Sequence, residues 1–196
     1  MEKLEALDDF TLELIPKLEL LCEQKNSPVL LIDGRAGAGK SSLAEALRNA
    51  LFKTRSQAPR IVHMDDLYPG WSGLHDGAMF LVNSILEPLV RSGSAHWQNW
   101  DWAKGQRGGV DVGNGWRSFH GGNLLVVEGC GSVSKRSREL ADLAVWVESD
   151  REIRYQRFIA RDNGKFKDQW SEWSAQEDFF YSSEDSKALC DIVLSN

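Results

Sequence analysis

Short apolar runs alternate along the chain with longer, helix-forming segments. The apolar runs cover residues 28–33, 60–64, 123–127, 143–147 and 191–194. Continuous apolar runs of this length are typical of strands buried on both faces of a parallel sheet. The helix-forming segments between and after them cover residues 41–53, 72–91, 150–163 and 168–182. Strands that alternate with helices predict a three-layer α/β fold with a roughly five-stranded parallel sheet.

Before the first strand, residues 2–24 predict an amphipathic helix, because leucines recur there at steps of three and four residues. Pro16 lies inside this segment and is expected to kink or break the helix. Another helix is expected to be interrupted or to end near Pro88. Within residues 110–119, the tripeptide Gly113-Asn114-Gly115 predicts the turn of a hairpin.

The composition is that of a globular protein, with 42% hydrophobic and 27% charged residues among 196. This length predicts one domain that covers residues 1–196. The net charge of −6 and the pI of about 5.3 disfavour a protein that binds nucleic acid, since such proteins usually present a basic surface.

The sequence gives no sign of export or membrane insertion. No apolar run approaches the roughly 20 residues of a membrane span, and the acidic start lacks the features of a signal peptide. Cys22, Cys130 and Cys190 are odd in number and have no metal-ligand spacing, which predicts free thiols in a reducing compartment. We therefore expect a cytoplasmic protein without a membrane partner.

A phosphate-binding loop follows the first strand. Gly34-Arg35-Ala36-Gly37-Ala38-Gly39-Lys40-Ser41 matches the pattern G-x-x-x-x-G-K-[ST] at every position, and Ser42 follows in the helix. Glycines let the backbone curl so that its N–H groups point at a phosphate, and the helix adds the positive end of its dipole. In such loops the lysine reaches the β- and γ-phosphates and the serine binds Mg²⁺. Residues 34–42 therefore predict a P-loop NTPase fold that binds ATP and Mg²⁺.

A dinucleotide-binding fingerprint is the competing interpretation of this loop. Gly37 and Gly39 supply two of its glycines, but Ser42 stands where the third is required. An incidental glycine turn is disfavoured because the match lies directly between a buried strand and a helix.

Met64-Asp65-Asp66-Leu67-Tyr68, at the end of the second strand, resembles the Asp-x-Phe-Tyr motif of the uridine kinase family, which includes phosphoribulokinase-like enzymes. The resemblance implies that Asp65 is the base toward an acceptor hydroxyl and that Tyr68 lies beside the acceptor. A carboxylate at the carboxyl end of a strand also faces the crevice where such sheets bind ligands. The alternative makes Asp65 and Asp66 turn residues before Pro69-Gly70, and for Asp66 a structural role or a contact to Mg²⁺-bound water is favoured.

Trp100-Asp101-Trp102, followed by Arg107, resembles the Tyr-Asp-Phe…His-x-Arg acceptor segment of the same family. The resemblance implies that Trp100, Asp101 and Arg107 hold the acceptor. Gly105 stands where uridine kinases have a histidine that helps to read the base, and this departure argues against pyrimidine nucleoside specificity. For each of the tryptophans at 71, 97 and 102, core packing is the simpler interpretation.

Val126-Val127-Glu128-Gly129 resembles the Glu-Gly pair that ends the third core strand of these kinases. A carboxylate directly after a buried strand is costly unless it has a partner. A Mg²⁺-bound water or the acceptor would be such a partner for Glu128. Ser41, Asp65 and Glu128 are therefore the residues predicted to serve the metal.

Residues 147–162 line up without gaps on a strand and the lid helix of this family. Spacings of three and four residues place Arg154, Arg157 and Arg161 on one helical face. Such a face can close over a triphosphate and stabilise the charge that develops during transfer. Arg157 and Arg161 are the residues expected to do so; a solvated basic stripe paired with acids is the alternative.

Together the motifs predict a kinase that transfers the terminal phosphoryl group of ATP to a hydroxyl of a small molecule. Residues 68–120 would form the acceptor side and residues 150–182 the lid. The helix of residues 2–24 and the tail with Trp170, Trp173 and Gln176-Glu177 have no counterpart in the resemblance. Neither the acceptor nor the oligomeric state follows from the sequence.

Two alternatives stay open. The loop also resembles the P-loop of cytidylate kinases, whose acceptor is a phosphate and which need arginines in the acceptor pocket; Arg107 and Arg117 are the candidates here. The other alternative is a nucleotide-binding regulator or slow NTPase without a small acceptor.

Overall fold

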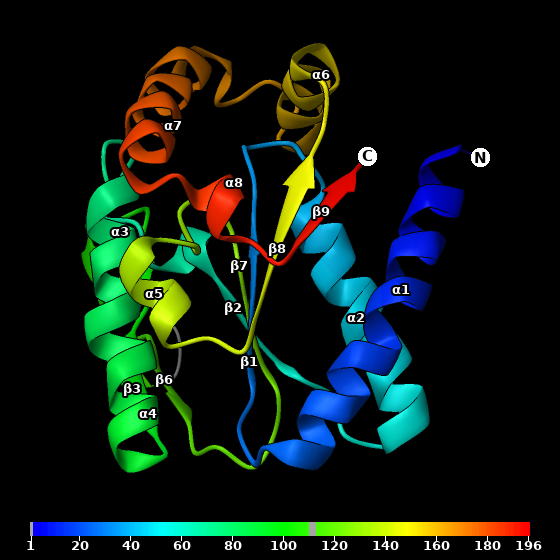
Figure 1. The fold of residues 1–196 in the computed structure, drawn as a ribbon. Helices are drawn as coiled ribbons and strands as arrows, with labels where there is room; N and C mark the ends of the chain where they lie inside the picture. Colours follow the sequence, from blue (N-terminus) through cyan, green and yellow to red (C-terminus); the bar gives the residue numbers. More distant parts are fainter. Residues whose placement is uncertain (1, 110–112) are drawn as a thin grey trace.

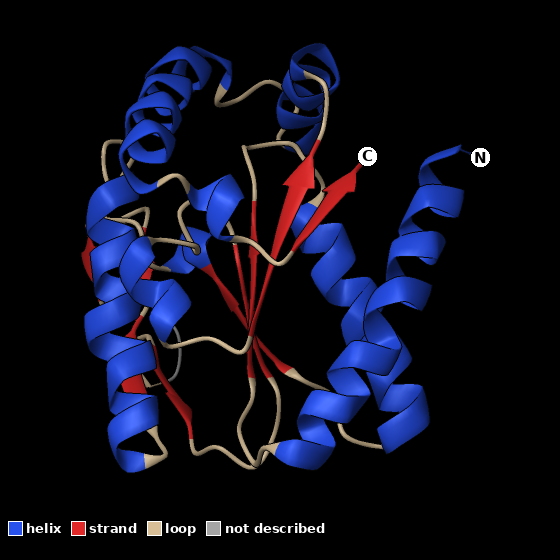
Figure 2. Cartoon of the chain, viewed as in Figure 1, coloured by secondary structure: helices blue, strands red, loops and turns tan. Residues whose placement is uncertain are grey.

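Five parallel strands form the central sheet in the part of the chain that the computed structural model describes, which is the backbone of residues 2–109 and 113–196 and the side chains of residues 9–109 and 113–196. In chain order the strands are β1 (Val29–Asp33), β2 (Arg60–His63), β7 (Leu125–Glu128), β8 (Leu143–Glu148) and β9 (Ile192–Ser195). Their spatial order is β2-β7-β1-β8-β9, and every neighbouring pair is parallel. Figure 2 shows the strands fanned out between two groups of helices, which confirms the predicted fold class.

Alternate residues of the strands face two separate cores. In β1, Leu30 and Ile32 belong to the core shared with α1 (Glu2–Gln24) and α2 (Lys40–Arg55), whereas Leu31 belongs to the opposite core. None of the three leaves any surface to water, which explains why the strand is a continuous apolar run. Figure 1 shows α1 and α2 on one side of the sheet and, on the other, α3 (Leu74–Leu81), α4 (Glu87–Ser92), α5 (Lys135–Glu139) and α7 (Trp170–Glu184).

The helix α1 continues through Pro16, so of the kink or break expected at this residue the break is wrong. Leu14 and Leu18, on either side of the proline, are fully buried in the core that α1 shares with α2. Burial of two leucines contributes about 4 kcal/mol, which offsets the roughly 3 kcal/mol that an internal proline costs.

None of the helices among the described residues combines the length and the apolar character that crossing a bilayer requires.

Between β2 and β7 the chain forms a helical rod that contains the predicted interruption. The rod consists of α3, a π-helical turn (Val82–Leu86) and α4. Pro88 lies in the first turn of α4 and has no N–H group to continue the helical ladder, so the turn before it widens. The interruption predicted near Pro88 is therefore confirmed.

Two small antiparallel sheets complete the segment between β2 and β7, residues 64–124, which is here called the insertion. β3 (Ala95–Gln98) pairs with β6 (Trp116–Phe119), and β4 (Trp100–Asp101) pairs with β5 (Gln106–Arg107). The hairpin expected within residues 110–119 lies partly outside the described residues, since 110–112 are not among them. Its second arm is β6, whose partner is β3. Gly113, Asn114 and Gly115 all have positive φ, as the predicted turn requires.

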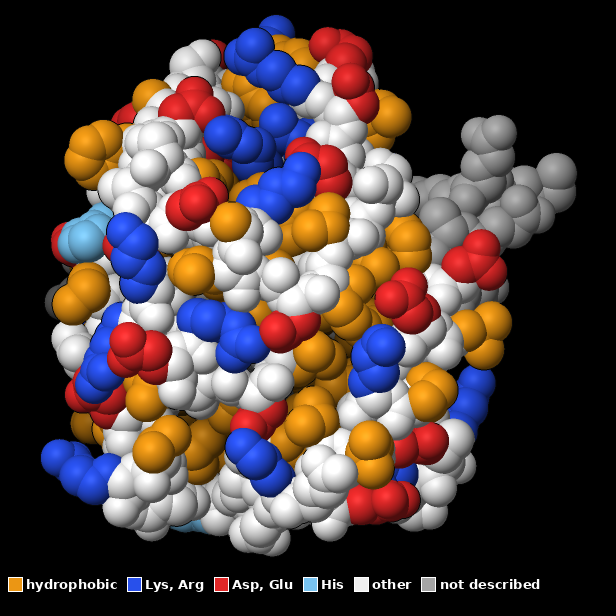
Figure 3. Space-filling view, in the orientation of Figure 1, with side chains coloured by type: hydrophobic (Ala, Val, Ile, Leu, Met, Phe, Trp, Pro, Cys, Tyr) orange, Lys and Arg blue, Asp and Glu red, His pale blue; other side chains and the backbone are white. Residues whose placement is uncertain are grey.

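The carboxyl ends of the strands meet the remaining helices at one end of the molecule (Figure 1). A 3₁₀ turn (Met64–Asp66) follows β2, and α6 (Arg151–Arg161) follows β8. A second 3₁₀ turn (Lys167–Gln169) leads into α7, and α8 (Ser186–Leu189) returns the chain to β9. In the space-filling view, Lys and Arg side chains gather toward this end of the visible face, although the net charge of the chain is −6 (Figure 3).

The carboxylate of Asp33, at the end of β1, joins three segments that are far apart in the sequence. Its Oδ1 accepts hydrogen bonds from the N–H of Gly34 at 2.6 Å, the N–H of Gly131 at 3.0 Å and the hydroxyl of Tyr181 at 2.8 Å. Its Oδ2 accepts from the N–H of Val133 at 2.8 Å. Complete burial raises the pKa of Asp33 to about 6, while these donors stabilise its ionised form. At neutral pH the carboxylate is therefore charged and fully engaged.

The variant Asp33→Asn is expected to lower the free energy of unfolding by about 3 kcal/mol, because a carboxamide NH₂ would face buried N–H donors that need an acceptor. Urea unfolding followed by circular dichroism measures this change. The exposed Asp168→Asn is the control, with an expected change below about 0.5 kcal/mol. Equal effects of the two substitutions would contradict the role of Asp33.

Candidate active site

The P-loop lies between β1 and α2 and needs its glycines for two reasons. Gly34, Gly37 and Gly39 all have positive φ, which side chains rarely tolerate. A Cβ on Gly34 would also lie 2.3 Å from the carbonyl oxygen of Val147, and a Cβ on Gly37 would lie 2.3 Å from that of Arg154. The backbone of the loop therefore packs directly against β8 and α6, and this contact restricts its conformation.

Lys40 is buried and donates to the loop itself. Its Nζ lies 2.7 Å from the carbonyl oxygen of Gly34 and 3.0 Å from that of Arg35, with the Sγ of Cys130 at 3.5 Å. Burial alone would lower the pKa of Lys40, but the negative potential of its neighbours, including Glu128, outweighs this effect and raises the pKa. The ammonium group is thus charged at neutral pH and held next to the cavity.

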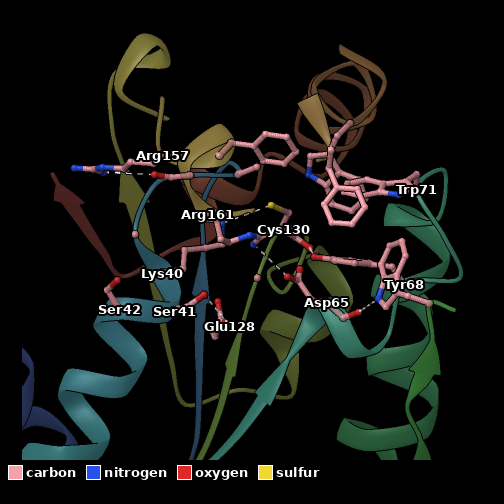
Figure 4. A pocket seen from close by; sticks show the side chains of 18 of the residues that line it. Lys40, Ser41, Ser42, Asp65, Tyr68, Trp71, Glu128, Cys130, Arg157 and Arg161 are labelled. Atoms are coloured by element: carbon pink, nitrogen blue, oxygen red, sulfur yellow. Dashed lines mark hydrogen bonds and ion pairs between the residues drawn. The ribbon is translucent and has the colours of Figure 1, made fainter. Parts of the chain in front are cut away.

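A cavity of about 670 Å³ opens beside the P-loop, within the size range of ligand pockets. The predicted site residues that line it are Ala36, Gly37, Gly39, Lys40, Ser41, Ser42, Asp65, Tyr68, Glu128, Arg157 and Arg161. Figure 4 shows Lys40, Ser41 and Glu128 at one end of the cavity, and Tyr68 and Trp71 at the other. Six of the nine predicted nucleotide-binding residues therefore share one space with Asp65, whereas Gly34, Arg35 and Ala38 are not part of its lining.

Ser41 and Glu128 form an oxygen-rich corner of this cavity. The hydroxyl of Ser41 donates to Oε1 of Glu128 at 3.0 Å, and the carboxylate is almost completely buried. Nδ1 of His63, at the end of β2, lies 2.6 Å from the same oxygen, and this hydrogen bond raises the pKa of His63. A hydroxyl and a carboxylate are ligands that suit Mg²⁺, so the residues fit the metal that the P-loop implies. Sequence reasoning missed His63.

Asp65 lies in the 3₁₀ turn after β2, with most of its side chain open to the cavity. Desolvation by the surrounding protein raises the pKa of Asp65, and the Arg161 guanidinium, 3.4 Å away, opposes this shift. The backbone oxygen of Asp65 accepts from the indole N–H of Trp102 at 2.9 Å, which connects the turn to the insertion. The structure thus brings together Asp65 and Arg161, the residues predicted as the base and as part of the lid, and these two roles stay predictions.

The acceptor segment around Trp100 lies elsewhere than predicted. Trp100, Asp101 and Arg107 are absent from the cavity lining in the described part of the chain. The guanidinium of Arg107 lies 3.3 Å from the ring centroid of Phe80 and donates to the carbonyl oxygens of Leu67 and Gln98. Oδ1 of Asp101 accepts from the backbone N–H groups of residues 103 and 104, which forms a local turn. Their hydrogen bonds brace the backbone next to the cavity.

The three arginines of α6 that the sequence analysis placed on one face divide into two kinds. Arg154 is buried and donates to the carbonyl oxygens of Ser149 and Ala36, so it attaches α6 to the P-loop. Arg157 and Arg161 line the cavity. The guanidinium of Arg157 donates to the carbonyl oxygen of Gly37 at 3.4 Å. The predicted helical face therefore splits into one structural arginine and two that face the cavity.

Glu177, on α7, is a buried neighbour of the P-loop whose role sequence reasoning did not assign. Its Oε1 accepts from the N–H of Ala36 at 2.6 Å and from the thiol of Cys130 at 3.3 Å. Its Oε2 lies 3.5 Å from the guanidinium of Arg35, which also pairs with Asp178 at 2.7 Å. An acidic residue inside an otherwise apolar face of α7 was the signal available in the sequence.

No protein-family model and no curated protein sequence matches this chain. Solved structures with the same fold do. The structure of a possible uridine kinase from Bacillus stearothermophilus matches 99% of this chain and 100% of its own, with a TM-score of 0.66 and 21% identity. D-glycerate 3-kinase from Cryptococcus neoformans matches 91% of this chain and 87% of its own, with a TM-score of 0.55 and 13% identity. The fold is thus the three-layer fold of P-loop kinases of the uridine kinase-like type.

The variant Glu177→Gln is expected to lower the melting temperature by roughly 5–10 °C, the equivalent of about 2–3 kcal/mol, because it removes the buried charge opposite Arg35. Differential scanning calorimetry measures the shift. The neighbouring Asp178→Asn breaks only the exposed ion pair of the same arginine and is the matched control, with a change below about 1 kcal/mol. If Asp178→Asn lowered the melting temperature more than Glu177→Gln did, the prediction that the buried contact of Glu177 is the more stabilising of the two would be wrong.

Proposed function

We propose that the protein is an ATP-dependent kinase that transfers the γ-phosphoryl group to a hydroxyl of a small molecule. One observation carries the proposal: a single cavity joins the P-loop residues Lys40 and Ser41 to the carboxylate of Asp65, with Glu128 between them. A nucleotide site without an acceptor would not require the open carboxylate of Asp65 beside the position of the terminal phosphate.

On the nucleotide side, the chain offers donors for a triphosphate. Lys40 would exchange the carbonyl oxygens of Gly34 and Arg35 for phosphate oxygens, and the N–H groups at the start of α2 would receive the rest of the chain of phosphates. Arg157 and Arg161 would stabilise the negative charge from the side of α6. Lys40, Arg157 and Arg161 line the same cavity, so these cations converge on one space.

Ser41 and Glu128 are the residues that would hold Mg²⁺, directly or through bound water, with Asp65 nearby. When bound, the metal neutralises phosphate charge and aligns the γ-phosphate. His63 holds Glu128 in place by the hydrogen bond to its Oε1. The chain therefore supplies oxygen ligands and a residue that orients one of them.

On the acceptor side, Asp65 would take the proton of the acceptor hydroxyl. The acceptor oxygen then forms a bond to the γ-phosphorus while the bond from that phosphorus to the β–γ bridging oxygen breaks, which releases ADP and the phosphorylated acceptor. Arg161 keeps the carboxylate of Asp65 oriented and charged before the proton moves. The remaining catalysis is positioning and electrostatics, as is general for phosphoryl transfer.

The contacts of Arg107 disfavour the nucleoside monophosphate kinase alternative. An acceptor phosphate needs arginines with free donors, and Arg107 is stacked on Phe80 and bonded to backbone carbonyl groups away from the cavity. Arg117 belongs to β6 and is likewise absent from the lining among the described residues. A hydroxyl acceptor is therefore the better fit.

The proposal predicts that at least one alcohol accelerates release of ADP from ATP and Mg²⁺. A coupled assay over nucleosides, sugars, sugar acids, vitamins and nucleoside monophosphates measures this rate. Lys40→Ala is expected to abolish turnover, because the ammonium group is the main cation on the phosphates. Tight ATP binding with no acceleration by any compound would instead support the nucleotide-binding regulator, and acceleration only by monophosphates would support the other kinase class.

The variant Asp65→Asn is expected to lower kcat by about 10²–10⁴-fold, the usual contribution of a general base, with little change in the affinity for ATP. Steady-state kinetics and calorimetric ATP titration measure the two effects separately. The adjacent Asp66→Asn is the control and should lose much less activity. If Asp65→Asn turned over normally, the assignment of the base would be wrong.

A further inference from the structure

The direction in which a triphosphate would lie in the cavity follows from the position of the proposed base. The γ-phosphate must lie nearest to Asp65, so the nucleoside must extend to the opposite side of Lys40. Figure 4 shows Ser42 and Arg157 on that side, away from Asp65 and Trp71. Both residues line the cavity. The nucleobase therefore belongs next to Ser42 and Arg157.

Asn196, which follows β9, lies beside this part of the cavity. Its carboxamide nitrogen Nδ2 donates to the carbonyl oxygen of Ala38 at 2.9 Å. A Cβ on Gly39, a residue of the cavity lining, would lie only 2.6 Å from the same nitrogen. Nη2 of Arg157 donates to Oδ1 of Asn196 at 3.4 Å. One carboxamide thus contacts both the P-loop and a side chain that lines the cavity.

The backbone on either side of this contact is well held. The N–H of Asn196 donates to the carbonyl oxygen of Glu148 at 2.8 Å, which continues the pairing of β9 with β8. Leu194, two residues earlier, is buried in the core that α1 and α2 share with the sheet. Asn196 itself is only partly buried. A polar group that is fixed but still accessible loses little further freedom when it binds a ligand.

The hydrogen bond to Ala38 also determines the orientation of the carboxamide. A reversed carboxamide would place Oδ1 against the carbonyl oxygen of Ala38, and neither of these two acceptors has a hydrogen to donate. Nδ2 therefore stays next to the P-loop and Oδ1 next to Arg157. Each of the two atoms retains capacity for one more hydrogen bond, since Nδ2 has a second hydrogen and Oδ1 a second lone pair.

A carboxamide of fixed orientation distinguishes adenine from guanine. Adenine presents the N6 amino donor beside the N7 acceptor, and this pair matches the oxygen and the NH₂ group of a carboxamide at the same time. Guanine presents O6 beside N7, which are both acceptors, so O6 would face Oδ1 of Asn196. The other edge of guanine, O6 beside N1–H, would require the reversed carboxamide that the bond to Ala38 disfavours.

We infer that Asn196 reads the nucleobase of the phosphoryl donor and that its carboxamide selects adenine over guanine. The inference rests on the proposed function, because the role of Asp65 sets the direction of the triphosphate. It also goes beyond that function, because the P-loop binds phosphates and does not distinguish one purine from another.

Calorimetric titration in the presence of Mg²⁺ tests the inference with ATP, GTP and inosine triphosphate (ITP). ITP carries O6 in place of the N6 amino group but lacks the 2-amino group of guanine. It therefore separates an effect of the hydrogen-bonding edge from a steric exclusion of GTP. We expect the unaltered protein to bind ATP at least about tenfold more tightly than GTP and ITP, which is within the usual discrimination of a bidentate pair.

Asn196→Ala is expected to weaken ATP binding by about tenfold and to leave ITP binding nearly unchanged, so that the preference for adenine is lost. Because Asn196 also contacts the P-loop, inorganic tripolyphosphate with Mg²⁺ is the control ligand, since it offers three phosphates and no base. Its Kd should be the same for the variant and the unaltered protein. Ser195→Ala alters the exposed neighbour on β9 and is the matched control variant, which should bind every ligand normally.

Equal affinities of the unaltered protein for ATP and ITP would contradict the inference, as would an unchanged preference for ATP in Asn196→Ala. An equal loss of ATP, ITP and tripolyphosphate binding in this variant would also overturn it, because Asn196 would then only support the P-loop.

The outcomes also separate this inference from the kinase proposal. If ATP binds with a preference that depends on Asn196 but no compound accelerates ADP release, the kinase proposal fails and the selection of adenine stands. If GTP or ITP supports transfer to an acceptor as well as ATP does, the kinase stands and the inference is wrong. Binding of no triphosphate at all would overturn both.

Discussion

The carboxylate of Asp33 is the point on which the geometry of the site depends. It accepts hydrogen bonds from the start of the P-loop at Gly34, from the segment after β7 at Gly131 and Val133, and from Tyr181 on α7. These segments carry Lys40, Cys130 and Glu177, which meet within hydrogen-bonding distance. A buried charge needs such a set of donors, so the requirement to satisfy one carboxylate also fixes the position of the P-loop lysine.

Parallel strands bring the chemistry together because their carboxyl ends share one edge of the sheet. Lys40 follows β1 through the P-loop, Asp65 follows β2, and Glu128 ends β7, so three neighbouring strands contribute one group each. The charges partly compensate one another: Asp65 pairs with Arg161, and His63 donates to Glu128. An acidic protein thereby keeps a cavity that can receive a polyanion, because its local cations lie on the P-loop and α6.

The parts of the structure that the sequence revealed are those governed by local pattern. Apolar runs located all five strands, and the P-loop, Asp65, Glu128 and Arg161 follow from residue type directly after a strand or along one helix. Arg107 stacks on Phe80 and donates to backbone carbonyl groups of distant segments. Residue spacing in the sequence does not predict contacts of this kind. Glu177 carried a signal, its place inside an apolar face of α7, but its partners Ala36 and Cys130 lie in distant segments that local pattern does not reveal.

The helix α7 sets the distance between the two ends of the cavity. Gln176 and Glu177 are adjacent, and successive helical residues point about 100° apart. Gln176 accordingly bonds to the insertion at Trp71 and Leu74, while Glu177 bonds to the P-loop at Ala36. The segment at Trp71 and Leu74 and the phosphate-binding loop are thus attached to one helix by neighbouring side chains. Because phosphoryl transfer depends mainly on positioning, the tail that has no counterpart in the family resemblance contributes directly to the alignment of the two substrates in the proposed reaction.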